Sequence, residues 1–185
     1  MVMWLRFGRW CNMTDNWIRT GLAVVMLASV FICGSASASL QPILFFDPDI
    51  VESNTGDDDN ISLIIDGAMR GLSGYGIIIG IDRPDIAEIT RMNLPDWVGT
   101  RDIRKLNSSA YLIQGTDIHE MHIPGALNIT LAEIRVHARA PGYATITASP
   151  VAIDDDQKGR YLTRHASGSI VITGAGPVPI IPMTA

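Results

Sequence analysis

The chain has 185 residues, a formal net charge of −5, and 18% charged side chains. This length is enough for one domain with its own hydrophobic core. An acidic chain repels phosphate groups, which argues against nucleic acids and anionic membranes as partners.

The first 38 residues have the composition of a secretory signal peptide. Three arginines precede an apolar run from Leu22 to Ile32, and small residues follow, with cleavage expected after Ala38. The apolar run is shorter than the roughly 20 residues that cross a bilayer, so a cleaved signal is favoured over a retained anchor. We therefore expect a secreted or cell-surface protein with no stable membrane span after signal removal.

Both cysteines, Cys11 and Cys33, lie inside this predicted signal. Acylation of Cys33 is an alternative, but bulky residues at 30–32 stand where a lipidation signal needs small ones. A start at Met13 would give a shorter signal. The remaining segment, 39–185, has no cysteine, so packing must stabilise it without disulfides.

After a lead-in over residues 39–47, the sequence predicts a series of short β-strands. The runs are rich in β-branched residues, alternate with period two, and are bounded by Gly, Pro, Asn or Asp. The expected strands cover residues 48–53, 61–66, 74–81, 86–92, 109–115, 129–138, 143–148, 150–153 and 170–172. No segment has the pattern of a long amphipathic helix.

The run from Ile129 to Ala138 changes parity within one predicted strand. Ile129 and Leu131 share one parity, whereas the apolar residues from Ala132 to Ala138 share the other. One inserted residue would place all of them on one face, so we expect a β-bulge near Leu131–Ala132. A short helical turn is the alternative. The bulge is favoured because the polar residues at 135, 137 and 139 then all point to solvent.

These elements predict an all-β fold, a two-sheet jelly-roll or immunoglobulin-like sandwich of about nine strands over residues 48–174. The Pro- and Gly-rich tail, residues 175–185, is too often interrupted to pack and is expected to be flexible. No internal repeat is visible.

The order of strand and turn patterns resembles the cohesin-like domain, a family related to a class of carbohydrate-binding modules. The residues that carry this similarity are Val51, Ile61–Asp66, Gly71–Tyr75, Asp85–Ile89, Leu94–Trp97, Leu131–Val136, Gly142–Thr147, Asp154–Asp156 and Gly168–Ile172. The chain is especially similar to single-domain versions in exported proteins of methanogenic archaea. The resemblance covers about residues 48–174 and implies a nine-stranded jelly roll, an extracellular location, and binding without catalysis.

Two acidic runs are candidate calcium sites, because Ca²⁺ takes six to eight oxygen ligands. Residues 57–60 lie between two predicted strands, and Asp154 and Asp156 follow another; the latter two are the better pair. Neither run has the spacing of an EF-hand, and solvated turns are the alternative. No cofactor is required by the sequence, and calcium is the one candidate.

Motifs for catalysis are incomplete. His119 and His122 are three residues apart, whereas the zinc-protease motif needs four on a helix, and Pro124 ends any helix. The glycines of 71–76 miss the spacing of a nucleophile elbow, and a strand follows where a phosphate loop needs a helix. We therefore assign no catalytic residue, although a glycosidase could hide its carboxylate pair from sequence reasoning.

Sugar binding would use exposed aromatic rings that pack on the sugar. Trp97 and Tyr143 are the candidate ligand-binding residues, although Trp97 could instead fill one end of the sandwich. The hypothesis is an exported non-catalytic module that binds a polysaccharide or an extracellular protein. The alternative is a structural cell-envelope domain of surface-layer type without a discrete ligand.

Overall fold

The computed structural model describes residues 41–174, and the expectations for the signal and the tail lie outside this range. The described residues form ten strands. They are β1 (Leu44–Asp47), β2 (Ile50–Asn54), β3 (Asp58–Ala68), β4 (Gly74–Ile81), β5 (Ala87–Asn93), β6 (Thr100–Lys105), β7 (Ala110–Thr116), β8 (Ala126–Ala138), β9 (Gly142–Asp154) and β10 (Ala166–Thr173). Within this range, no helix is long and apolar enough to cross a membrane.

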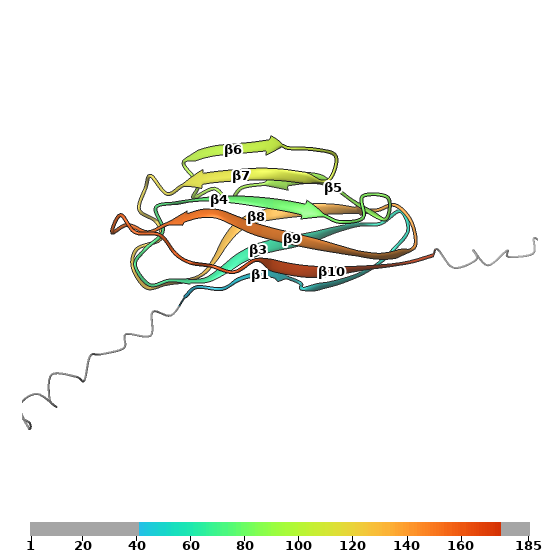
Figure 1. Cartoon of the computed structure of the whole chain (residues 1–185), viewed down its shortest axis with the longest axis horizontal. Coiled ribbons are helices and arrows are strands. Elements are labelled where there is room, and N and C mark those ends of the chain that lie inside the picture. Colours follow the sequence, from blue (N-terminus) through green and yellow to red (C-terminus); the bar gives the residue numbers. More distant parts are fainter. Residues whose placement is uncertain (1–40, 175–185) are drawn as a thin grey trace, which may run out of the picture. The chain divides into compact units, whose positions relative to one another are not determined.

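The strands form two facing sheets, which confirms the predicted all-β sandwich. One sheet has the order β1-β3-β8-β5, and the other has the order β2-β10-β9-β4-β7-β6. All neighbours are antiparallel except β2 and β10, which are parallel. Figure 1 shows the six-stranded sheet in front of β3 and β8.

The core lies between the sheets and follows the predicted alternation. Along β4, Tyr75, Ile77, Ile79 and Ile81 are all buried. They meet the apolar side chains of the other sheet, among which Leu63 is fully buried. Burial of these apolar side chains is the main stabilising contribution in a domain without disulfides.

The predicted bulge in β8 is confirmed. Leu63 pairs with Ala132, and the next residue of β3, Ile64, pairs with Thr130, so Leu131 is the extra residue. Leu131 and Ala132 are both fully buried, as are the alternate apolar positions on either side of them. The Tyr75 hydroxyl donates to the carbonyl of Leu131 across 2.6 Å, which satisfies a backbone group that the bulge withdraws from regular pairing.

The strand assignment differs from expectation in several places. The domain begins before residue 48, because β1 pairs with β3 and buries Leu44 and Phe46, so residues 44–47 are not a lead-in. Strand β3 begins at Asp58, so most of the acidic run 57–60 lies within a strand and not between two strands. The predicted strands 143–148 and 150–153 are one strand, β9, with a bulge at Val151. Strand β6 was not expected, because all its residues are exposed at a sheet edge and show no alternation.

Candidate functional site

Three loops meet at one end of the sandwich. They are residues 69–73 between β3 and β4, 117–125 between β7 and β8, and 155–165 between β9 and β10. The N–H of Leu72 donates to the carbonyl of His122, and the N–H of Asp156 donates to that of Arg70. These hydrogen bonds between the loops hold together residues that are distant in the sequence.

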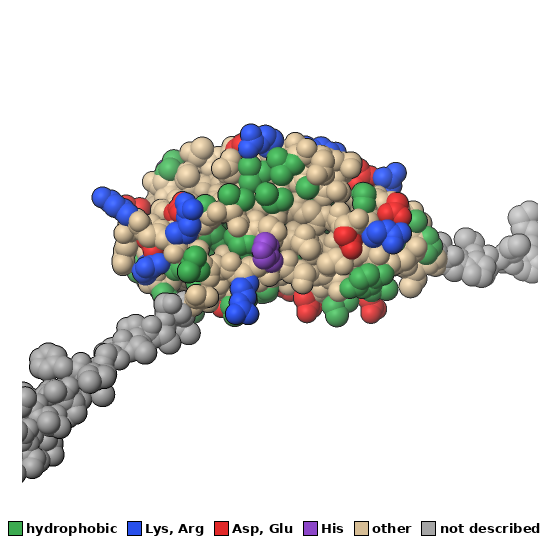
Figure 2. Space-filling view, in the orientation of Figure 1, with side chains coloured by type: hydrophobic (Ala, Val, Ile, Leu, Met, Phe, Trp, Pro, Cys, Tyr) green, Lys and Arg blue, Asp and Glu red, His purple; other side chains and the backbone are tan. Residues whose placement is uncertain are grey.

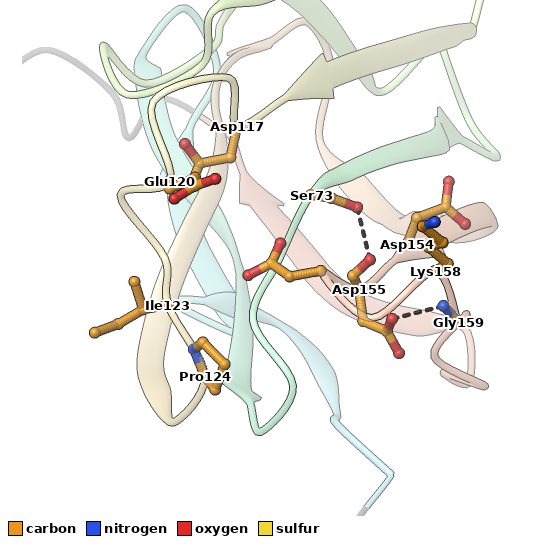
Figure 3. Close-up of a pocket in the computed structure, with 10 residues that line it drawn as sticks. Ser73, Asp117, Glu120, Ile123, Pro124, Asp154, Asp155, Lys158 and Gly159 are labelled. Carbon is orange, nitrogen blue, oxygen red and sulfur yellow. Dashed lines mark hydrogen bonds between the residues drawn. The ribbon is translucent and has the colours of Figure 1, made fainter.

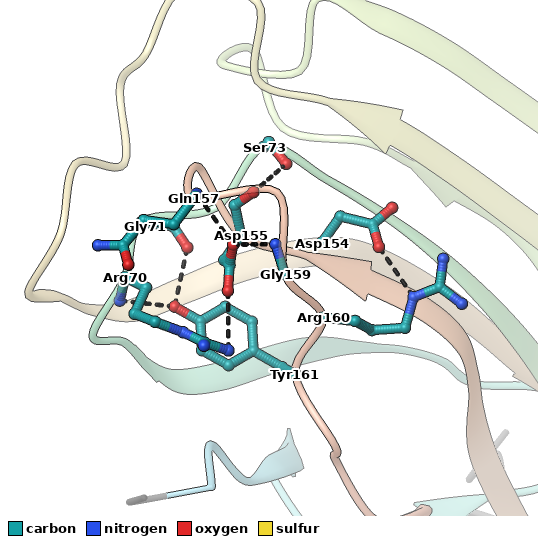
Figure 4. A network of polar contacts seen from close by, with 9 residues as sticks. All are labelled: Arg70, Gly71, Ser73, Asp154, Asp155, Gln157, Gly159, Arg160 and Tyr161. Atoms are coloured by element: carbon teal, nitrogen blue, oxygen red, sulfur yellow. Dashed lines mark hydrogen bonds and ion pairs between the residues drawn. The ribbon is translucent and has the colours of Figure 1, made fainter.

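Asp155 is the centre of a buried polar network (Figure 4). Its carboxylate accepts hydrogen bonds from the N–H groups of Gln157 and Gly159 at 2.9 and 2.6 Å. The Arg70 guanidinium lies 2.8 Å from the other oxygen, and the Asp155 side chain is fully buried. The Ser73 hydroxyl donates to the backbone carbonyl of Asp155. The network therefore fixes the loop after β9 against the loop before β4.

Tyr161 adds a second tie between the same loops. Its hydroxyl accepts from the N–H of Arg70 at 2.7 Å and donates to the carbonyl of Gly71 at 2.9 Å. The Arg70 guanidinium also lies over the tyrosine ring, 5.3 Å from its centroid. Gly71 has a φ of 78°, and a Cβ atom there would overlap the Asp156 carboxylate. This glycine therefore serves a tight loop crossing and belongs to no nucleophile elbow.

Asp117 shapes the loop between β7 and β8. Its buried carboxylate accepts from the N–H groups of Met121 and His122 at 3.0 and 2.8 Å, and the His122 ring lies 3.1 Å away. Burial acts to raise the pKa of Asp117, but these hydrogen bonds and the histidine outweigh it, so the net pKa is lowered. The ionised carboxylate thus stabilises the loop.

The variant Asp117→Asn is expected to be about 1–3 kcal/mol less stable than the native protein near pH 6, because a charged acceptor is lost. A carboxyl whose pKa is lowered by folding stabilises the protein above its unfolded pKa of about 3.9, and this contribution is lost as the pH falls through the folded value. The difference in free energy of unfolding between the two proteins should therefore become smaller in acid. Urea denaturation of both proteins between pH 2.5 and 6 measures this difference. A difference that does not change with pH would contradict a stabilising role for the ionised Asp117 carboxylate.

An acidic pocket of about 540 Å³ opens among these three loops (Figure 3). Its lining residues are Ser73, Asp117, Glu120, Ile123, Pro124, Asp154, Asp155, Asp156, Lys158 and Gly159. The pKa of Asp156 is raised by burial first, and then by the nearby charges of Asp117, Glu120 and Asp155. The pocket therefore concentrates negative charge.

The candidate calcium residues Asp154 and Asp156 both lie at this pocket. The Asp154 carboxylate already pairs with Arg160 at 2.9 Å. Across residues 41–174, no three His, Cys, Asp or Glu side chains lie close enough together to hold a metal ion. Calcium binding at Asp154 and Asp156 stays a prediction.

Trp97 lies half-buried at the same end of the sandwich. Its indole N–H donates to the carbonyl of Thr130 at 3.1 Å, and its ring packs on Tyr75 and on His122, with centroids 6.0 and 4.4 Å apart. This is the end-filling position that the sequence left open as the alternative to ligand binding.

Tyr143 lies far from Trp97. It is 55% exposed at the start of β9, where its hydroxyl lies 2.9 Å from that of Ser169. Trp97 packs on Tyr75 near the start of β4, whereas Tyr143 lies at the start of β9, three residues beyond the one that pairs with Ile81 at the other end of β4. At about 3.3 Å per residue, these nine positions place Tyr143 roughly 30 Å from Tyr75, too far for one small aromatic platform.

Sequence reasoning missed the outer face of the six-stranded sheet. Four neighbouring strands, β10, β9, β4 and β7, present outward side chains that carry no charge, except for Asp154 at the last position of β9. We call this surface the uncharged face; its residues are Ser167, Ser169, Val171, Tyr143, Thr145, Thr147, Ser149, Gly76, Ile78, Gly80, Ala110, Leu112 and Gln114. In Figure 2 charged side chains lie mainly toward the margin of this side of the molecule.

The outer face of the four-stranded sheet is different. Its strands β3, β8 and β5 present Asp58, Glu88, Glu133 and Arg135 to solvent. Two of these form an ion pair, Arg135 with Asp58 at 3.5 Å. Charged side chains are depleted at the centres of protein interfaces, so the uncharged face is the better candidate for docking.

A histidine borders the uncharged face. The His165 ring nitrogen Nδ1 lies 2.8 Å from the Ser149 hydroxyl. The two residues lie on an open sheet surface, and neither lines the pockets described between residues 41 and 174. A serine and a histidine in contact would need a water-excluding site and an oxyanion hole to act as a nucleophile pair.

Solved structures of other proteins share this architecture. The solution structure of CaCohA2 from Clostridium acetobutylicum superposes with a TM-score of 0.60 and 18% identity, covering 74% of this chain and 94% of that one. The chain has a cohesin fold. A non-cellulosomal cohesin from the hyperthermophilic archaeon Archaeoglobus fulgidus matches with a TM-score of 0.56 and 12% identity, covering 72% of this chain and 90% of that chain.

The cohesin fold recurs among proteins solved with partners. A chain of a type I cohesin–dockerin complex from Clostridium thermocellum matches with a TM-score of 0.56 and 12% identity, over 71% of this chain and 93% of that one. No family model matches the chain, and no curated protein matches it significantly. The fold that the resemblance implied is thus confirmed by structure at low sequence identity.

Proposed function

We propose that this cohesin-like chain is a non-catalytic module that binds a protein partner outside the cell or at its surface. The uncharged face carries the proposal. It spans four strands, is flat because three of its residues on β4 and β7 are glycine or alanine, and offers Ile78 near its centre with Leu112 beside it on β7. A surface with a neutral centre and a charged rim is typical of protein interfaces.

The structural comparisons support a protein as the partner. Several chains with the same fold were solved in complex with dockerins, and one archaeal example is described as non-cellulosomal. The fold is therefore used for protein recognition in other chains. The predicted signal and the cysteine-free segment 39–185 support a location outside the cell.

A polysaccharide partner has less support. Tyr143 is the one exposed aromatic side chain of the uncharged face, and Trp97 is committed to packing at the other end of the sandwich. One ring gives little of the stacking area that sugar recognition uses. The binding experiment distinguishes a discrete partner from a structural role in the cell envelope.

The test uses two isoleucines in matched positions. Ile78 and Ile64 are both half-buried and point outward from β4 and β3, on opposite sheets. Ile78→Arg places a charge at the centre of the uncharged face, so it should abolish capture of a specific partner from the host's envelope and medium. Ile64→Arg should leave capture intact. The loss of affinity expected for Ile78→Arg is on the order of 100-fold, because a side chain at the centre of an interface is replaced by a charge.

Equal capture of a partner by both variants would show that the uncharged face is not the binding surface. If the native protein retains no partner, the structural envelope role is favoured over the binding role. Parallel pull-downs with a chelator test the calcium prediction. A chelator effect that disappears in Asp156→Asn would assign calcium to the acidic pocket.

A further inference from the structure

The end of the sandwich where the loops meet carries a concentration of exposed apolar side chains. Of the twelve large apolar residues that are exposed between residues 41 and 174, five lie on or beside the loop from β7 to β8, so their clustering needs an explanation. Ile118 packs against Gly99. The others, which we call the loop-end patch, are Met69, Met121, Ile123 and Leu127, with exposed fractions of 48, 63, 63 and 62%.

The loop-end patch is held in place by the backbone below it. The N–H of Gly125 donates to the carbonyl of Ala68 at 2.9 Å, and the N–H of Ala126 donates to that of Ile123. A Cβ atom on Gly67 would lie 3.2 Å from Leu127 and 3.6 Å from Met69, so these two side chains flank the same glycine. With Asp117 fixing the start of the loop, the apolar side chains are presented to solvent before any partner arrives, which lowers the entropic cost of binding.

The acidic pocket adjoins this patch, and Ile123 belongs to both. Asp154 and Asp155 have arginine partners, whereas Glu120 and Asp156 form no ion pair within residues 41–174. Lys158 at the rim offsets part of this charge. The pocket is within the size range of clefts that enclose a ligand group, and it is ample for one long basic side chain.

We propose that the loop-end patch and the acidic pocket together bind a basic, apolar segment of a protein, with apolar side chains on the patch and a lysine or arginine in the pocket. Charge complementarity selects this occupant. A second copy of this acidic chain, a nucleic acid or an anionic lipid surface would bring negative charge to negative charge. This surface lies on the loops, apart from the uncharged face, and does not depend on the function proposed above.

The probe is a short synthetic peptide in which lysine and leucine alternate, titrated into the protein and followed by calorimetry and by amide NMR signals. We expect binding that weakens at high salt, with signal changes confined to residues 67–70, 118–127 and 154–159. The double variant Glu120→Gln/Asp156→Asn should weaken it about tenfold, because two exposed charge interactions of about 0.7 kcal/mol each are lost. Ile123→Ser should weaken it by a similar factor.

The matched control for Ile123→Ser is Ile50→Ser, which removes an isoleucine of similar exposure from β2 and should change nothing. Two further peptides separate the contributions. Replacing lysine by glutamate should abolish binding, and replacing leucine by serine should weaken it about tenfold. Equal binding of the glutamate peptide, equal binding of the serine peptide, or signal changes centred on β4 and β7 would each overturn the proposal, whatever the outcome for the Ile78 variant.

Discussion

Deleting Leu131 is expected to lower the free energy of unfolding by about 4 kcal/mol, a large share of the stability of a domain of this size. Leu131 is the extra residue of the β8 bulge. Without it the residues on either side can keep their β3 partners in a regular ladder, so Ile129 stays on the core face. The core loses one large side chain, which costs roughly 3 kcal/mol, and the buried Tyr75 hydroxyl loses its acceptor, which adds roughly 1 kcal/mol.

The variant Leu131→Ala separates the side chain from the bulge. It keeps the extra residue and removes only the buried side chain, so it should cost about 3 kcal/mol. Guanidinium denaturation of the native protein and both variants gives the comparison. A deletion no more harmful than the alanine variant would show that the hydrogen bond from Tyr75 to the bulge adds no stability.

Asp155→Asn is expected to destabilise the protein by about 3 kcal/mol. The amide keeps the shape of the side chain but removes the charge that faces Arg70 and that two backbone N–H groups approach. Hydrogen bonds to a buried charged group are worth about 1.5–3 kcal/mol each, and losing the ion pair with the half-exposed Arg70 adds to this.

The neighbouring Asp154→Asn provides the control. Asp154 also pairs with an arginine, but both partners are about half exposed, so its loss should cost less than about 1 kcal/mol. Chemical denaturation of the two variants, with the same substitution one residue apart, tests whether burial makes the difference. Equal effects would mean that the Asp155 network does not anchor the loops.

Much of the fold could be predicted because local pattern and tertiary environment agree. Strand β4 was predicted with its observed bounds, since one of its faces is apolar throughout and packs in the core. The bulge of β8 was predicted because a change of parity has few other structural solutions. Local pattern failed for β6, an edge strand with no buried face, and at Pro150, which was taken as a boundary. This proline lies beside the bulge of β9, beyond the part that pairs with β10.

The candidate surfaces were harder to predict. Trp97 and Tyr143 were chosen by residue type, and only the pairing of β4 with β9 shows that they lie at opposite ends. The uncharged face combines β10, β9, β4 and β7, whose order in the sheet does not follow their order in the chain. The Asp155 network likewise joins residues more than 80 positions apart. Neither feature has a signal within a single segment.

The parallel pairing of β2 with β10 has a mechanical consequence. The first residue of β2 and the last of β10 lie at opposite ends of their five paired residues. Once β1 is detached from β3, tension between the two ends of the domain pulls these strands along their length in opposite directions. Their hydrogen bonds are then loaded together in shear, whereas an antiparallel terminal pair would open one bond at a time. The rate of forced unfolding should be low for this geometry.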